Sequence, residues 1–178
     1  VVNTGDNTNG SNISLSAFLA QYTKNTAALA TSIAPYLMQL GNHDANNYID
    51  NPIANVPKDA DLFPPFQNIF AQSGVVAGDA TNKKRYYYCD ATQGGHTVRI
   101  IMLDMLDHPD YTGNNTNYAC QSNVVYSQDQ IDWLANTALD VPANYGVIIC
   151  NHFPFAPLRQ SGYSEQYPAL NDGYFVQS

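Results

Sequence analysis

Three short segments of this sequence carry side chains that could bind a metal ion, and each follows an apolar run that predicts a β-strand. The segments are residues 5–10, 41–44 and 151–154. The carboxyl ends of parallel strands meet at one edge of a sheet, where ligands bind in open α/β folds. Asp6, Asn42 and His152 offer two oxygen ligands and one imidazole, a set that suits divalent first-row metals. The sequence therefore predicts one metal site formed by three loops.

Strands and helices should alternate around these loops. Strands are expected at residues 1–4, 36–40 and 145–150, each leading into one loop. Leu15, Phe18, Leu19 and Tyr22 lie near helical spacing, and Ser14 or Ser16 can cap a helix that runs to about residue 32. The resulting strand–helix–strand unit predicts a parallel strand pair.

The second half of the chain has a different pattern. Strands at 85–90 and 97–105 flank a Gly-Gly turn and predict an antiparallel hairpin. We expect one short helix within 64–73 and another from Ser127 to about Leu139. Polar, proline-containing segments predict long loops at 45–60 and 107–125.

The loop motifs resemble those of the calcineurin-like metallophosphoesterase family. That family carries, in order, D-x-H, G-D-x-x-D/N, G-N-H-D/E, a strand ending in His, and G-H-x-H, and the middle three occur here. Weaker likenesses to the family's later strands and helix lie at 86–88, 100–104 and 130–134, so the resemblance covers residue 1 to about 157. It implies an α/β fold, a four-layer α/β/β/α sandwich with mixed sheets.

The first and last motifs of that family are not in the sequence. We therefore expect residues 1–178 to be an incomplete excerpt of a metallophosphoesterase catalytic domain. A D-x-H strand would precede it and a G-H-x-H segment would follow it in the full gene product. Those motifs would supply the remaining metal ligands.

The resemblance also implies a role for each motif residue. Asp6 would bridge two divalent ions, Mn, Fe or Zn, while Asn42 and His152 would bind one of them. His43 would act as the general acid, and Asp44 would orient and charge it through the ring N–H. The implied reaction is hydrolysis of a phosphomonoester or phosphodiester by a metal-bound hydroxide at a dinuclear centre.

Three further residues are candidates for contacts with the phosphate ester. They are Asn9, His108 and Arg159. Each also has a plainer interpretation, as a residue that holds its loop or lies on the surface. The alternative for the whole chain is a non-catalytic binding or structural module, such as a phage appendage or surface protein, because a fold does not guarantee a function.

The composition narrows the classes of partner. The net charge is −8 with only 7 basic residues, which disfavours nucleic acid, since its binding depends on clustered Lys and Arg. No apolar run approaches the roughly 18 residues that a membrane span needs. Cys89, Cys120 and Cys150 show no C-x-x-C spacing; Cys89 and Cys120 could pair, and Cys150 should be a small core residue. Abundant Asn and Tyr with scarce Lys favours an extracytoplasmic or virion-associated setting.

Overall fold

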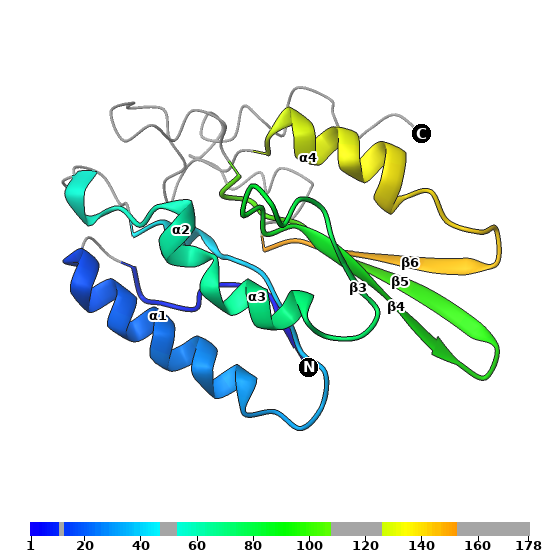
Figure 1. Ribbon diagram of the computed structural model, residues 1–178, viewed down its shortest axis with the longest axis horizontal. Helices are drawn as coiled ribbons and strands as arrows, with labels where there is room; N and C mark the ends of the chain where they lie inside the picture. The colour runs from blue at the N-terminus through cyan, green and yellow to red at the C-terminus, as the bar shows by residue number, and fades with distance from the viewer. Residues whose placement is uncertain (11–12, 47–52, 108–125, 153–178) are drawn as a thin grey trace, which may run out of the picture.

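The computed structural model describes residues 1–10, 13–46, 53–107 and 126–152 of the 178-residue chain. These residues form two sheets (Figure 1). The smaller is a parallel pair, β1 (Val2–Asn3) and β2 (Leu37–Met38). The larger has the order β3 (Val75–Ala77), β4 (Tyr87–Gln93), β5 (His96–Met102) and β6 (Tyr145–Cys150).

The larger sheet is mixed. β3, β4 and β5 pair antiparallel, whereas β5 and β6 pair parallel with Met102 opposite Cys150. Gly94 and Gly95, with φ of 59° and 81°, form the turn of the β4–β5 hairpin, as the sequence predicted. The parallel β5–β6 pair brings the carboxyl end of β6 next to the segment that follows β5, where Leu103 N donates to Cys150 O.

The helices begin at the predicted caps. The Ser14 hydroxyl accepts a hydrogen bond from Ala17 N and starts α1 (Leu15–Ala30), and Ser127 caps α4 (Gln128–Trp133) in the same way. A π-helical turn, Leu134–Ala138, extends α4 to the predicted end. The short helix expected within 64–73 is α3 (Pro64–Phe70), which has proline in its first turn.

Side chains alternate between the two faces of β5 and so divide the core. Met102 packs with α1, β2 and α3 side chains, including Phe18, Met38 and Phe66. Ile101 packs in a second cluster with Leu134 of the π-helical turn. α4 therefore covers one face of the larger sheet, while the smaller sheet with α1 and α3 lies on the other (Figure 1). This is the expected α/β architecture with mixed sheets.

The structure corrects several local predictions. The segment expected to be a loop at 45–60 contains a 3-10 turn, Ile53–Asn55, and the start of α2 (Asp59–Leu62), and β3 was not predicted at all. Two apolar side chains of β6, Val147 and Ile148, are 39% and 51% exposed. Among the described strands β6 pairs only with β5, so its outer edge gains no cover from a neighbour. No helix in the described ranges combines the length and apolar character that a bilayer span requires.

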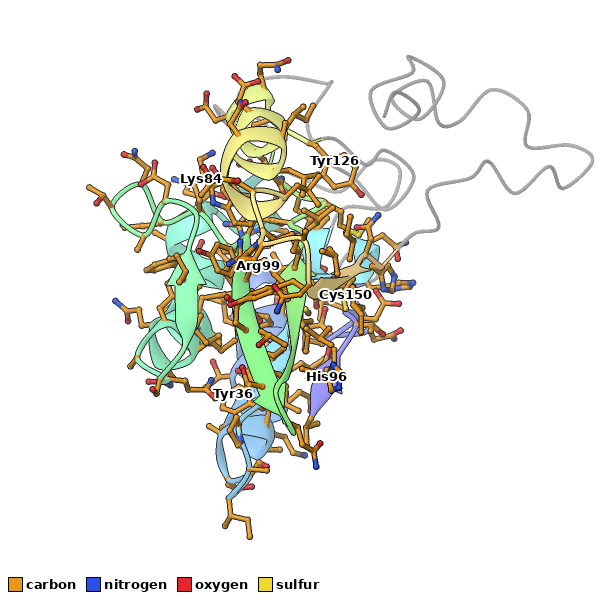
Figure 2. The ribbon with its side chains drawn as sticks, turned by 90° about the vertical axis from the view of Figure 1, so that its right-hand side faces the viewer. Tyr36, Lys84, His96, Arg99, Tyr126 and Cys150 are labelled. Carbon is orange, nitrogen blue, oxygen red and sulfur yellow. The ribbon has the colours of Figure 1, made fainter. Side chains whose placement is uncertain are left out.

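Two buried arginines tie the layers together. Arg99 of β5, labelled in Figure 2, pairs with Asp90 through two nitrogens at 2.8 and 2.9 Å. Its remaining nitrogen donates to the carbonyls of Ala138 and Asp140. Its guanidinium also lies 3.8 Å from the ring centre of Tyr88. Because one side chain satisfies carbonyls at the end of the helical segment, it fixes that end against the sheet.

Arg85 occupies the other buried position, before β4. Its Nε lies 2.8 Å from Asp104 Oδ2, in ionic contact without hydrogen-bond alignment, and Nη1 donates to Asp59 at 2.7 Å. Burial lowers the pKa of Arg85, but the two carboxylates outweigh it and raise that pKa overall. Burial raises the pKa of Asp104 to about 6 in spite of the arginine. This charged cluster joins the segment before β4 to α2 and to the segment after β5.

Candidate metal and catalytic site

The three predicted loops meet at one point. Nε2 of His152 lies 3.1 Å from Asn42 Oδ1 and 3.4 Å from Asp6 Oδ1. Asp6 and Asn42 lie 110 positions or more from the histidine in the sequence. The β1–β2 pairing places the Asp6 and Asn42 loops side by side, and His152, after β6 of the other sheet, joins them through its ring. The side chains remain accessible, with Asp6 39% and His152 19% exposed.

Main-chain geometry fixes which nitrogen His152 presents to its neighbours. Nδ1 lies 2.7 Å from the carbonyl oxygen of Thr4. A carbonyl only accepts hydrogen bonds, so Nδ1 carries a hydrogen and Nε2 is the ring nitrogen that faces Asp6 and Asn42. An imidazole held in this way by a carbonyl is the arrangement found for metal-ligating histidines.

His43 is held beside the same point by both its main chain and its ring. Its N–H donates to Asp6 Oδ1 at 3.1 Å, and its Nδ1 lies 2.7 Å from Asn9 O. The carbonyl of Asn9 again requires a hydrogen on Nδ1. Nε2 is therefore the atom of His43 that can take up or release a proton.

Glycines allow these loops to approach so closely. A Cβ on Gly5 would lie 2.7 Å from Gly41 Cα and 2.8 Å from His152 Nδ1, and Gly5 has a φ of 107°. A Cβ on Gly41 would strike the Asp6 main chain and carboxylate. A Cβ on Gly10 would collide with the carbonyl of His43. Glycine is the residue that permits such contacts between backbones.

Asp6 itself adopts a left-handed conformation, with a φ of 54°. Asp tolerates this region better than most residues, but it is sparsely populated by any side chain other than glycine. Strained main-chain positions of this kind cluster at ligand-binding sites. Here the strain accompanies a carboxylate that faces two neighbouring loops.

Asp44 does not take the role predicted for it. Its carboxylate is fully buried, and it accepts hydrogen bonds from Asn7, Thr8 and Gly41 rather than from the His43 ring. Residues 42–45 form a 3-10 turn, which points the Asp44 side chain back to Gly41 N at 2.9 Å. The ring of His43 faces the Asn9 carbonyl instead.

Asn7 is a site residue that the sequence did not reveal. Its main-chain N and its Nδ2 both donate to Asp44 Oδ2, at 3.1 and 2.9 Å. The only local indication of the Asp44 contacts was its position three residues after Gly41, which is the spacing of an N-cap and the third residue of a helix. That spacing could have predicted the bond to Gly41 but not the partner 37 residues away.

The remaining predicted residues separate into two groups. Asn9 is exposed and lies at the site, where its carbonyl contacts His43 and its N–H faces Gln21. His108 and Arg159 fall outside the described residues. Within the described ranges no group of three or more His, Cys, Asp or Glu side chains is placed to hold a metal. The side chains that meet at His152 Nε2 are one carboxylate and the amide of Asn42.

Comparison with known proteins identifies one family. A family model described as calcineurin-like phosphoesterase matches residues 1–175. No curated protein and no solved structure matches the chain significantly.

Proposed function

This chain belongs to the calcineurin-like phosphoesterase family, and we propose that it is a metal-dependent hydrolase of phosphomonoesters or phosphodiesters. The family generally uses divalent metals and acts on phosphate esters. The observation that supports the proposal for this chain is the convergence of Asp6, Asn42 and His152, with His43 beside them.

The spacing of these side chains fits a divalent ion. Ligand atoms about 2.1 Å from one ion lie roughly 3.0 Å apart at a right angle and roughly 3.4 Å apart at a tetrahedral angle. The separations from His152 Nε2 are 3.1 Å to Asn42 Oδ1 and 3.4 Å to Asp6 Oδ1. The donor set of carboxylate, amide oxygen and neutral imidazole also suits Mn, Fe or Zn.

Asp6 has capacity for a second ion. Its Oδ1 faces His152 Nε2 and the main chain of His43, whereas its Oδ2 has no polar partner among the described residues. One carboxylate that bridges two ions brings them to roughly 3.5–4 Å, the separation used in two-metal hydrolysis. A dinuclear centre built on Asp6 is therefore part of the proposal.

The chain's own residues have distinct tasks in this reaction. Bound divalent ions would polarise the phosphoryl group and offset its developing negative charge. Asp6, Asn42 and His152 would hold those ions, and His43 would donate the Nε2 proton to the oxygen of the departing alcohol. The Asn9 carbonyl supports that step because it keeps the other ring hydrogen on Nδ1.

The rival interpretation, a non-catalytic module, gains no specific support. It would not require an accessible imidazole and carboxylate to face each other across three loops. The family match does not favour it either. Monoester and diester substrates share every residue described here, so both belong to the proposal.

The test compares Asp6→Asn with Asp132→Asn in the intact protein. Asn tolerates the left-handed conformation of Asp6 and removes only its charge. Asp132 is an exposed residue of α4 and supplies the matched control. Mn²⁺ binding is measured by titration calorimetry, and turnover is measured with aryl phosphate monoesters and diesters.

Asp6→Asn should weaken Mn²⁺ binding by more than the roughly 10–100-fold typical of outer-shell changes, and should abolish turnover. Asp132→Asn should match the wild type. Wild-type protein that binds no Mn²⁺, Fe²⁺ or Zn²⁺, or that hydrolyses neither class of ester, would refute the proposed function.

A further inference from the structure

A single buried carboxylate joins the two loops that carry Asp6 and Asn42. Oδ2 of Asp44 accepts hydrogen bonds from Asn7 N, Asn7 Nδ2 and Gly41 N, and Oδ1 lies 3.2 Å from the Thr8 hydroxyl. Burial raises the pKa of Asp44, while these hydrogen bonds lower it. The carboxylate thus accepts hydrogen bonds from both loops of the site, from Asn7 and Thr8 after β1 and from Gly41 after β2.

Asn7 contributes more to this junction than any other residue. It is 4% exposed, and its Nδ2 donates to the Gln39 carbonyl at 3.0 Å as well as to Asp44. Its own carbonyl accepts from Asn25 Nδ2 of α1 at 2.7 Å. The main chain of Asn7 is therefore fixed on both sides immediately after Asp6.

The amide of Asn7 also lowers the stability of the fold, which indicates that its role is to position the loop. Its Oδ1 is buried and has no hydrogen-bond partner among the described residues. A buried acceptor without a partner destabilises the fold, because it loses its hydrogen bonds to water. An apolar side chain would avoid this penalty, so the two Nδ2 bonds are what an asparagine supplies at this position.

We propose that Asn7 is a positioning residue for the cation site, and that its bonds to Asp44 set the spacing between Asp6 and Asn42. The inference rests on the proposed function, since it concerns the same site. Asn7 follows Asp6 directly, and Asp44 lies two residues after Asn42 in the same 3-10 turn. A shift in the Asn7–Asp44 contact therefore moves one ligand relative to the other.

The exchange of the two side chains offers a sharp test. Asn7→Asp removes both Nδ2 bonds and places a second carboxylate against Asp44, which repels it. Asn7→Asp combined with Asp44→Asn restores one amide and one carboxylate in contact, with their positions reversed. Asn136→Asp, at an exposed position of the π-helical turn, is the matched control for the change in charge.

The experiment measures Mn²⁺ affinity of the folded, intact protein by calorimetry, and the visible absorption spectrum of the Co²⁺ form. Circular dichroism verifies folding, and urea denaturation reports stability separately. Asn7→Asp should weaken Mn²⁺ binding by roughly 10–100-fold and alter the Co²⁺ spectrum. The double exchange should recover part of that affinity, and Asn136→Asp should bind like the wild type.

Asp44→Asn is measured alone as well, to complete the cycle. Wild-type affinity and spectrum in folded Asn7→Asp would overturn the inference, as would a double variant whose loss of affinity equals the product of the losses of Asn7→Asp and Asp44→Asn. If Asn7→Asp does not fold, Asn7→Ala replaces it, because it keeps the main-chain donor and removes only the side-chain bonds. Unchanged Mn²⁺ affinity in folded Asn7→Ala would then be decisive against the role. Failure of the wild type to bind Mn²⁺ would instead count against the proposed function.

Discussion

Replacing Gly5 by alanine tests whether the three loops are packed as tightly as the structure indicates. An alanine at a φ of 107° costs about 1–3 kcal/mol of backbone strain. Its Cβ would also lie 2.7 Å from Gly41 Cα and 2.8 Å from His152 Nδ1. Relieving such overpacking costs about a further 1–3 kcal/mol. The sum of about 2–6 kcal/mol corresponds to a fall in Tm of about 4–24 °C for a chain of this size.

Gly95→Ala is the control for the strain alone. Gly95 has a φ of 81°, but a Cβ there meets no atom within 4 Å. The difference between the two variants in urea denaturation therefore isolates the close packing, and we expect Gly5→Ala to be the more destabilising by about 1–3 kcal/mol. Mn²⁺ affinity should fall for Gly5→Ala only. Equal losses of stability in both variants, with equal Mn²⁺ affinity, would refute the packing argument.

Two further predictions concern single ionisable residues. His43→Ala should retain Mn²⁺ binding but lower kcat by roughly 10²–10⁴-fold, with a smaller loss for aryl than for alkyl esters; equal losses would contradict the general-acid role. For Asp104, the folded-state pKa of about 6 exceeds the roughly 3.9 of an unfolded Asp, so the folded state binds its proton more tightly. Its contribution to stability should be greatest below about pH 4 and should decline as the pH rises to about 6. The free energy of unfolding, measured by urea denaturation between about pH 4 and 6, should lose this pH dependence in Asp104→Asn. An unchanged pH dependence would show that other groups cause it.

Local patterns in the sequence were enough to predict the main elements that carry the site. Ser14 and Ser127 predicted the starts of α1 and α4, and Gly94-Gly95 predicted the hairpin, because caps and tight turns depend on nearby residues. The rule that ligand loops lie at the carboxyl ends of parallel strands predicted the meeting of Asp6, Asn42 and His152, although the strands that precede them belong to two sheets and not to one. The short elements α2 and β3 were not predicted, because so few residues show no hydrophobic periodicity.

The contacts of Asp44 could not be predicted in the same way. We expected it to serve His43, its neighbour in the sequence, but a 3-10 turn directs its side chain to Gly41 and to the Asp6 loop. The hydrogen-bond donors of a buried carboxylate depend on the tertiary fold, and the donor Asn7 lies 37 residues before Asp44 in the sequence. Asparagine is common in the first loop, so composition alone could not single out this one.

The hydrogen bond between His152 and Thr4 has a consequence for the order in which the molecule is made. It spans 148 residues of sequence. At a synthesis rate of about 5–20 residues per second, His152 is added roughly 7–30 s after Thr4. During that interval the nascent chain holds the Asp6 and Asn42 loops without the imidazole, so the three side chains can meet only after β6 and the His152 loop have been translated.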